Sequence, residues 1–343
     1  MNSIDLQTRT LYSELLEQMQ LLDASRTINS LKGSFTIKNI GEESYVYFQH
    51  YTPGGKLTQT YIGKRDSNTE RLVQEHADGK SDFAEMRDNI RRLGTQVEAG
   101  LKIRTDRVMA RVIRSLADAG VFRNGGVLVG THAFQATAVM LGVSWDADTM
   151  ATSDVDVAAE KNVSIAIPQV DSDIPATLES LQMGFFPVPR LSRKEPSTTF
   201  AVRKSRMRLD ILTPSIGGSE SPVFIKRFNC AAMPLNYLGY LIEAIIPAVL
   251  PDTEPVLVNI PQPARYAMHK LIVSQVRDIS TDAKRAKDLH QAFQMLSLLK
   301  EEHPFDLKPA WNDLVSRGPS WKKNAEKGLL EMERRYGKLG LDL

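Results

Sequence analysis

One stretch near the middle of the chain, Asn124 to Ala159, constrains the fold most, because its apolar and polar residues follow a definite order. Val127 to Val129 is a short apolar run of the kind that forms a buried strand. Gly130 and Thr131 follow and suit a tight turn that presents backbone N–H groups and a hydroxyl. An apolar helix is expected over residues 132–141, and a second strand after it.

The second strand carries two aspartates, Asp154 and Asp156, on one face, since strand side chains repeat every second residue. Two carboxylates this close repel each other, and a divalent cation that also binds a triphosphate is a common reason for such a pair. The alternative is a solvated strand edge. The Gly-Thr turn and the helix that precede the pair favour the metal site. Residues 163–167 prolong this strand or begin another.

In this order the elements resemble the nucleotidyltransferase fold of the DNA polymerase beta superfamily: an apolar strand, Gly-Ser or Gly-Gly, a helix, and a strand with Asp-x-Asp or Asp-x-Glu. Here Thr131 replaces the commoner Ser and keeps the hydroxyl. The gap before the aspartates is longer than in compact members, and residues 144–153 are expected to fill it as a loop. The resemblance implies that Asp154 and Asp156 hold metal, and that Gly130 and Thr131 hold the β- and γ-phosphates of a nucleoside triphosphate (NTP).

The superfamily has a third carboxylate on a later strand, and Asp210 is its match by order and context. Residues 199–202 and 206–212 predict two strands around a basic turn, and Arg206, Arg208 and Asp210 share one face of the second. The resemblance implies that Asp210 completes the metal site or acts as general base for an attacking hydroxyl. A salt-bridge network with the two arginines is the alternative.

The segment from residue 263 to 299 predicts two helices, the first beginning at Pro263 and the second near Thr281. Their His-Lys-Leu and Lys-Asp-Leu sequences are similar to the C-terminal helices of AbiE-type nucleotidyltransferase toxins, and to a bacterial family of uncharacterised nucleotidyltransferase-fold proteins. The resemblance implies that three further residues face the nucleotide: Lys270, Lys287 and Asp288. An ordinary interhelical salt bridge explains them equally well.

The first hundred residues have a different character. Residues 4–22 predict an amphipathic helix, and residues 33–63 a three-stranded antiparallel meander with turns at 41–43 and 53–55. A polar helical stretch follows over residues 69–101, with interruptions expected near Gly79, Gly94 and Gly100, and an amphipathic helix over residues 105–119. Aromatic and basic residues of the meander are candidate nucleic-acid contacts, namely Tyr45, Tyr47, Tyr61, Lys38, Lys56, Lys64 and Arg65. The favoured alternative is that a sheet this small packs its aromatic residues against helices.

Amino-acid composition excludes only a few kinds of protein and site. The chain has 343 residues, a formal net charge of +2 and a single cysteine, Cys230. One cysteine excludes an internal disulfide and a cysteine-rich zinc site, and it suits the reducing cytoplasm. The polar N-terminal residues are not expected to form a signal peptide. The apolar run at residues 235–250 is too short to span a bilayer and is expected to be a core helix.

We therefore expect an α/β (α+β) nucleotidyltransferase fold: an N-terminal helix and meander over residues 1–100, a catalytic core with a short mixed sheet over 101–262, and a C-terminal helical region over 263–343. The expected reaction transfers a nucleoside monophosphate from an NTP, with Mg²⁺ or Mn²⁺ held by Asp154, Asp156 and Asp210. RNA such as a tRNA end is the favoured acceptor, in a toxin or defence component. A protein or small-molecule acceptor, or a non-catalytic nucleotide- or nucleic-acid-binding module, are the alternatives.

Overall fold

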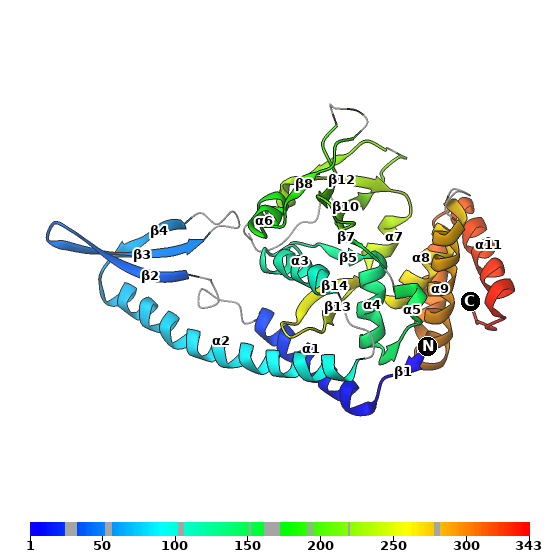
Figure 1. The fold of residues 1–343 in the computed structure, drawn as a ribbon, viewed down its shortest axis with the longest axis horizontal. Coiled ribbons are helices and arrows are strands. Elements are labelled where there is room, and N and C mark those ends of the chain that lie inside the picture. The colour runs from blue at the N-terminus through cyan, green and yellow to red at the C-terminus, as the bar shows by residue number, and fades with distance from the viewer. Residues whose placement is uncertain are drawn as a thin grey trace.

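The computed structural model is elongated, and a small antiparallel sheet stands away from a larger body (Figure 1). The structure describes residues 1–24, 33–51, 57–101, 106–150, 152–160, 172–190, 192, 195–218, 220–277 and 282–343. Three features expected from the sequence lie outside these residues: the turn at 53–55 with Lys56, the helix start at Thr105, and the strand at 163–167.

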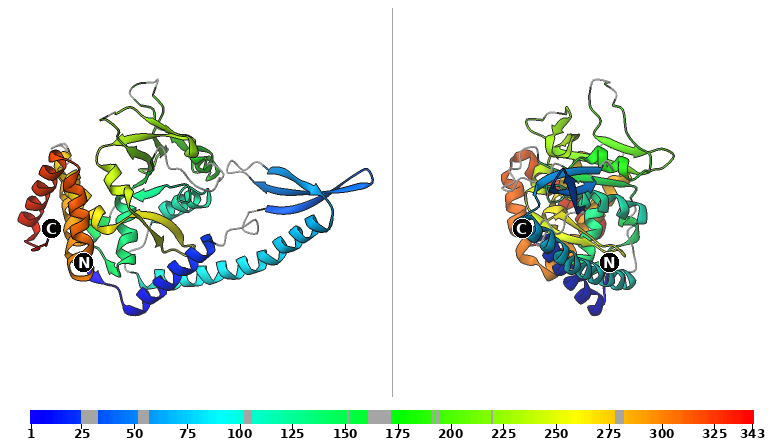
Figure 2. Two further views of the ribbon diagram at one scale, coloured as in Figure 1. Left: turned by 180° about the vertical axis from the view of Figure 1, so that it is seen from behind. Right: turned by 90° about the vertical axis from the view of Figure 1, so that its left-hand side faces the viewer.

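Residues 1–100 form the predicted helix and meander. The elements are β1 (Asn2–Ser3), α1 (Leu6–Ala24), β2 (Gly33–Ile40), β3 (Glu43–Tyr51), β4 (Leu57–Lys64) and α2 (Ser67–Gly100). The three strands β2, β3 and β4 pair antiparallel in chain order. They lie at the N-terminal end of α2, whereas α1 runs back along the opposite half of that helix, nearer the body (Figure 2).

Two of the expected interruptions of α2, at Gly79 and Gly94, are wrong, because the helix is continuous over its 34 residues. The helix ends at the third, Gly100. A glycine inside a helix costs about 1 kcal/mol relative to alanine, which the flanking turns can tolerate. Gly94 has a packing role, because a Cβ atom at this position would lie only 2.5 Å from the carbonyl oxygen of Asp252. The glycine therefore allows the helix to approach the body closely.

The second half of α2 and all of α1 pack on the body through a small apolar cluster. Its buried members are Tyr12, Leu15, Ile90, Val97 and Val249. The Tyr12 hydroxyl accepts a hydrogen bond from the Val249 N–H at 3.0 Å and donates one to the Val249 carbonyl at 3.3 Å. These helices cover apolar surface of the body, whereas the meander touches only α2 among the described elements with substantial contact.

The body is built on a mixed seven-stranded sheet, as the sequence predicted. Five strands follow the order β11-β12-β10-β7-β5, and β9 pairs with β10 and β8. β10 is parallel to β7 and β12, whereas β5 and β9 are antiparallel to their neighbours. The bounds are β5 (Val127–Val129), β7 (Asp154–Ala158), β8 (Phe185–Pro187), β9 (Thr199–Val202), β10 (Arg208–Pro214), β11 (Val223–Ile225) and β12 (Cys230–Leu235).

Helices and a second sheet complete the body. They are α3 (Arg107–Asp118), α4 (Gly130–Met140), β6 (Val143–Ser144), α5 (Ala147–Met150), α6 (Ile174–Ser180), the 3-10 helix η2 (Lys226–Phe228), α7 (Leu238–Glu243), β13 (Ile245–Leu250) and β14 (Val256–Pro261). Two expectations are wrong here. Residues 144–153 include the helix α5, and the second half of the run 235–250 is a strand. Pro247 disfavours a helix interior, and β13 instead pairs antiparallel with β14 along its whole length.

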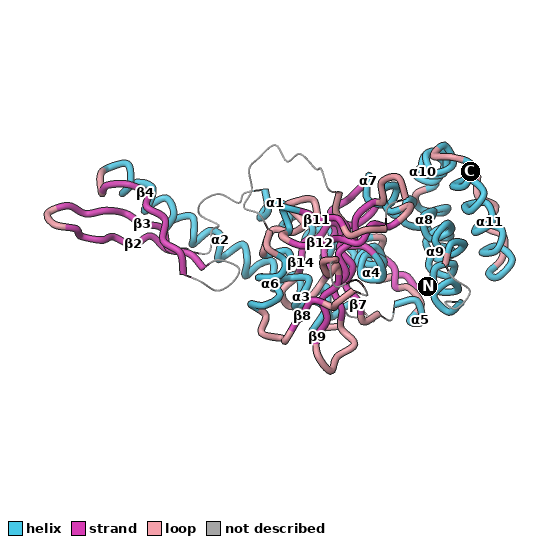
Figure 3. Tube along the Cα trace, turned by 90° about the horizontal axis from the view of Figure 1, so that it is seen from above, coloured by secondary structure: helices cyan, strands magenta, loops and turns pink. Residues whose placement is uncertain are grey.

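The C-terminal region is helical, with α8 (Pro263–Val276), α9 (Asp282–Glu302), α10 (Pro304–Ser316) and α11 (Pro319–Tyr336) side by side at the end of the molecule far from the meander (Figure 3). Two tryptophans of this region dock it on the body. Trp321 packs edge-on against Tyr237 at 4.6 Å between ring centroids, and Trp311 packs against the main core.

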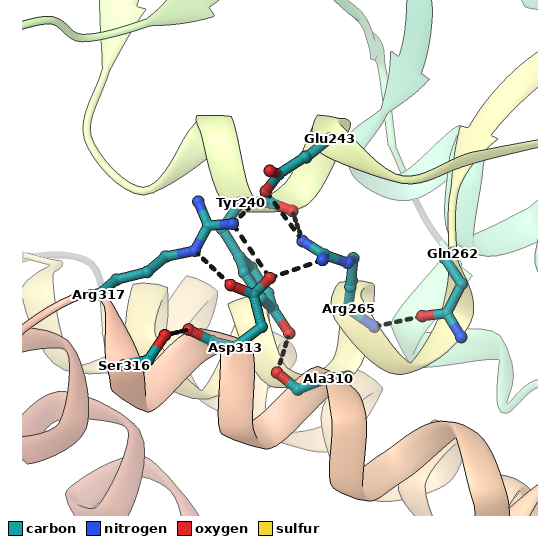
Figure 4. Close-up of polar contacts among 8 residues, drawn as sticks. All are labelled: Tyr240, Glu243, Gln262, Arg265, Ala310, Asp313, Ser316 and Arg317. Atoms are coloured by element: carbon teal, nitrogen blue, oxygen red, sulfur yellow. Dashed lines mark hydrogen bonds and ion pairs between the residues drawn. The ribbon is translucent and has the colours of Figure 1, made fainter.

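A charged cluster joins this region to the body (Figure 4). The Asp313 carboxylate on α10 accepts hydrogen bonds from Arg265 of α8 at 2.6 Å and from Arg317 at 3.0 and 3.1 Å. Both guanidinium groups also lie over the Tyr240 ring, at 4.7 and 5.1 Å from its centroid. The Tyr240 hydroxyl donates to the Ala310 carbonyl at 2.8 Å. One carboxylate therefore holds two cations from separate elements.

Asp313→Ala should lower the free energy of unfolding by about 2 kcal/mol, because the two partly buried arginines then keep only the more exposed Glu243 as a carboxylate partner among the described residues. Burial acts to raise the pKa of Asp313, and the two arginines outweigh it, so the pKa is lowered. The carboxylate therefore stabilises the fold above its unfolded-state pKa, and the difference should shrink as pH falls through that range. Urea titration at pH 7 and pH 3.5 measures it. Asp342→Ala is the control, since Asp342 is 92% exposed in its pair with Lys308 and should change little.

Candidate functional site

Asp156 and Asp210 are direct neighbours on adjacent parallel strands. The register of β7 and β10 pairs Asp156 with Asp210 and Asp154 with Arg208. Neighbouring strands lie about 4.8 Å apart, so the two carboxylates project side by side. Val155 and Val157 are fully buried on the other face of β7. The apolar residues therefore fix which face the aspartates occupy, and all three carboxylates share it.

The charge of Asp156 is poorly compensated by the protein. Burial, and then Asp210 and Asp154, raise the pKa of Asp156 to about 7, while Lys270 and Lys284 oppose the rise. Its carboxylate forms no hydrogen bond or ion pair with any residue that the structure describes. A hard cation bound by oxygen ligands would supply the missing positive charge, so the donor set fits Mg²⁺ or Mn²⁺.

Asp210 differs from Asp156 in having a hydroxyl partner. Burial raises the pKa of Asp210, and the Thr199 hydroxyl of β9, which donates a hydrogen bond to its carboxylate, acts the other way. Thr199 pairs with Asp210 in the register of β9 and β10. Sequence reasoning did not identify Thr199, although its place on the strand preceding Asp210 was visible. The alternative, a salt-bridge network of Arg206 and Arg208 with Asp210, does not form among the described residues, although the charge of Arg208 acts to lower the pKa of Asp210.

Gly130 is required by both conformation and space. Its φ is +66°, in the left-handed region that disfavours residues with a side chain, and an ideal Cβ would lie 2.3 Å from the Asp156 carboxylate. The Tyr266 hydroxyl of α8 donates to the Gly130 carbonyl at 2.9 Å. Gly130 and Thr131 are the first two residues of α4, whose N-terminal N–H groups favour an anion.

Lys287 reaches the same helix N-terminus from α9. Its ammonium donates to the Thr131 hydroxyl at 3.1 Å. Burial, and then the charge of Lys270, lower the pKa of Lys287. Two residues that the sequence assigned to the nucleotide are thus brought together, 156 positions apart in the chain.

Lys270 and Asp288 form the interhelical salt bridge that the sequence left open as an alternative. Lys270 Nζ lies 2.6 Å from one oxygen of Asp288, and Arg277 Nε lies 2.5 Å from the other. The Lys270 and Asp288 side chains are 12% and 4% exposed. Burial acts to lower the pKa of Lys270, but Asp288 outweighs it and the pKa is raised. Arg277 is a partner that sequence reasoning missed.

Lys284 is a further cation that sequence reasoning missed. It lies on α9 three and four residues before Lys287 and Asp288, and so on the same face of the helix. Its charge is close enough to oppose the raised pKa values of Asp156 and Asp210. The i, i+3, i+4 spacing was the signal that could have identified it.

A second acidic group lies apart from the three aspartates. Among the described residues, ligand atoms of Asp146, Asp148 and His290 all lie within 4.8 Å of one another, a limit that Asp154, Asp156 and Asp210 do not meet as a set. His290 already contacts both carboxylates, at 3.3 and 3.4 Å. Asp146 also accepts from the N-terminal ammonium of Met1 at 2.5 Å. The carboxylates of Asp146 and Asp148 therefore already have partners within the protein, and this acidic group does not need a metal ion.

A mixed sheet that presents three aspartates beside a helix beginning with glycine is the arrangement expected of a nucleotidyltransferase fold. A family model described as "Nucleotidyltransferase" matches residues 107–316, more than half of the chain. The chain belongs to this nucleotidyltransferase family.

Other comparisons add little. A family model for a domain of unknown function matches residues 5–72. No curated protein matches the chain. A solved structure, an antigenic nucleotidyltransferase-like protein from Paracoccidioides brasiliensis, is 16% identical with a TM-score of 0.33, over 64% of this chain and 92% of that one. No helix within the described ranges is long and apolar enough to cross a membrane.

Proposed function

We propose that this protein transfers a nucleoside monophosphate from an NTP to a hydroxyl of an RNA acceptor, with Mg²⁺ bound by Asp154, Asp156 and Asp210. The observation that carries the proposal is the pairing of Asp156 with Asp210 on adjacent strands, beside Gly130 at the start of α4. When bound, the metal supplies positive charge to the triphosphate and to the attacking oxygen.

The chain's own residues have distinct tasks in this reaction. Gly130, Thr131 and Lys287 bind the β- and γ-phosphates through N–H groups, a hydroxyl and an ammonium. Asp210, which lies beside Asp156 on the adjacent strand, takes the proton of the attacking hydroxyl. The acceptor oxygen forms a bond to the α-phosphorus. The bond from that phosphorus to the α–β bridging oxygen breaks, and pyrophosphate leaves with the electron pair.

A non-catalytic nucleotide-binding module is the weaker hypothesis. Three carboxylates on one face raise the free energy of the folded protein, and Asp156 in particular is held with a pKa near 7. A module that only bound a nucleotide would be more stable without Asp156. The presence of Asp156 despite this loss of stability supports a role for its charge in metal-assisted chemistry.

The shape of the protein favours a macromolecular acceptor. α2 has 34 residues, which at about 1.5 Å per residue span roughly 50 Å. The meander at its far end and β7, the strand of the body that carries Asp154 and Asp156, are well separated (Figure 1). A small molecule could not contact both, whereas an RNA could.

The testing experiment incubates the full chain with each labelled NTP, Mg²⁺ and total RNA, and then separates RNA from protein on a gel. Label in the RNA fraction, dependent on Mg²⁺ and lost in Asp154→Asn, supports the proposal. Label in the protein fraction identifies a protein acceptor, and label in neither identifies a small molecule or no transfer. Either of the last two results would refute RNA transfer.

Addition of a nucleotide to the mature 3′ end of a tRNA would prevent its aminoacylation and so block translation, and this links the proposal to a toxin or defence role in the cytoplasm. Induced expression of the full chain should then arrest growth, and Asp154→Asn should not. Unimpaired growth with active protein in the cell would argue against the toxin role while leaving the reaction intact.

Lys287→Ala should lower kcat/KM for the NTP at least about tenfold, because it removes a charged contact worth about 1.5–3 kcal/mol from the phosphates. Lys284→Ala should have a smaller effect of the same sign. Initial rates at varied NTP concentration measure both. Lys327→Ala on α11 removes an exposed lysine elsewhere and is the matched control. Equal kcat/KM values for Lys287→Ala and Lys327→Ala would contradict the phosphate contact.

A further inference from the structure

The two faces of the meander have different roles. On β3, Val46 and Phe48 are buried, and Phe48 packs edge-on against Phe35 of β2 at 5.1 Å. Both phenylalanine rings contact the His76 ring of α2, at 5.1 and 5.7 Å. These residues attach the sheet to the helix. The expectation that the aromatic residues pack against a helix is right for this face.

The opposite face carries tyrosines that take no part in this packing. The register of β3 and β4 pairs Tyr47 with Tyr61 and Tyr45 with Lys64, which puts all four on one side. The Tyr61 ring lies 5.5 Å from Tyr47 and 6.1 Å from Tyr45. Tyr61 is 55% exposed. We call Tyr45, Tyr47 and Tyr61, with Lys38 and Lys64, the tyrosine face.

Charge is distributed unevenly across the meander and α2. The tyrosine face has two lysines and one acid, Glu43, which pairs with Lys64. The Lys38 ammonium lies 4.8 Å from the centre of the Tyr47 ring. The first turns of α2, behind the sheet, carry an excess of acids, with Glu70, Glu75 and Asp78 against Arg71. An anionic partner is therefore attracted to the tyrosine face rather than to the helix.

We infer that the tyrosine face binds unpaired nucleotides of the acceptor. Aromatic rings beside lysines are the combination that stacks bases while attracting the phosphate backbone. Unpaired rather than duplex nucleotides are favoured, because a base must leave its helix to stack on a side chain. The inference rests on the proposed nucleic-acid acceptor, and it assigns a ligand to the region matched by a domain of unknown function.

The test measures fluorescence anisotropy of a labelled, unstructured 15-nucleotide RNA with the full chain, without NTP. Tyr47→Ala/Tyr61→Ala should raise Kd at least about tenfold, since stacking on one base is worth about 1–3 kcal/mol. Tyr47→Phe/Tyr61→Phe keeps the rings and should bind within about twofold of wild type. Phe305→Ala is the matched control, because Phe305 is an aromatic residue 91% exposed on α10. Unchanged affinity in the double alanine variant would overturn the inference.

A second measurement does not depend on the tyrosine variants. Lys38→Ala/Lys64→Ala should lower the slope of log Kd against log salt by about 1.4, or about 0.7 for each phosphate contact to a single strand. A 15-base-pair RNA duplex should bind more weakly than the single strand, and single-stranded DNA of the same sequence shows whether the 2′-hydroxyl contributes. Tighter binding of the duplex, or an unchanged salt slope, would count against the tyrosine face.

The binding assay separates this inference from the proposed reaction. Asp156→Asn should bind the RNA with wild-type affinity and transfer nothing. Binding without transfer in the wild-type protein would refute the reaction alone. Transfer with no loss of RNA affinity in Tyr47→Ala/Tyr61→Ala would refute the tyrosine face alone. A concentration-dependent dimer in sedimentation that the same variant abolishes, with RNA affinity unchanged, would identify the face as a self-association surface instead.

Discussion

Asp156→Asn should abolish nucleotidyl transfer and, at pH 8, make the metal-free protein more stable. Both effects have the same cause. The carboxylate lies beside two others and without a cationic partner among the described residues, so it is suited to a metal and unfavourable without one. Asparagine keeps the shape of the side chain and removes the charge.

The sign of the pH dependence follows from the raised pKa. Asp156 ionises at about 7 in the folded protein, against 3.8 as its ordinary value. Below pH 3.8 it is protonated in both states and costs nothing. Between pH 3.8 and pH 7 Asp156 is ionised in the unfolded chain and protonated in the folded protein, so the free energy of unfolding falls as pH rises. Above pH 7 the free energy of unfolding has fallen by its full amount, which is at most about 4 kcal/mol. The true value is smaller because the Asp156 side chain keeps some contact with solvent.

Denaturant titrations of wild type and Asp156→Asn in EDTA, from pH 4 to pH 8, measure this difference. The two proteins should be nearly equal at pH 4 and diverge as pH rises. Added Mg²⁺ should stabilise wild type more than the variant, because only the wild-type site retains all three carboxylates. Asp154→Asn is the matched comparison, and it should lose transfer. A variant less stable than wild type at pH 8, or one that still transfers, would show that Asp156 is not a metal ligand.

The central motif could be read from the sequence because local patterns determine it. The alternation of Asp154, Val155, Asp156 and Val157 permits only one way of burying the valines, and the aspartates then share the other face. The Gly-Thr turn follows from an apolar strand that must end before a helix begins. The three-stranded meander was equally clear, because its turns and its β-branched and aromatic residues are local signals.

Features that depend on distant partners could not be read in this way. The strand β13 forms because residues 256–261 pair with it, and the apolar run alone fits a helix as well as a strand. The contact of Lys287 with Thr131 requires α9 to cross the N-terminus of α4. The grouping of Tyr61 with Lys64, three residues later on β4, on one face of the meander depends on a bulge in the pairing at Val46 and Tyr47, and no local pattern in the sequence indicates that bulge.

Asp288→Ala should destabilise the protein by about 3–5 kcal/mol, the usual cost of removing one partner of a buried ion pair. Without the carboxylate, Lys270 and Arg277 face each other near a site that already holds Lys284 and Lys287. Lys270→Ala should cost less, because Arg277 still neutralises Asp288. The sequence left a contact of Lys270 with the nucleotide and an interhelical salt bridge as equal alternatives, and the buried pair favours the salt bridge.

A double-mutant cycle with Lys270→Met and Asp288→Leu separates the ion pair from any direct contact of Lys270 with the nucleotide. If the lysine acts only through Asp288, the double variant should regain most of the stability lost in Asp288→Leu and keep the wild-type KM for the NTP. Lys270 also opposes the raised pKa of Asp156. Its removal should therefore shift the pH at which Mg²⁺ binding is half lost to a higher value, because protons then compete better for Asp156. Recovered stability with an unshifted pH profile and a normal KM would confine Lys270 to a structural role.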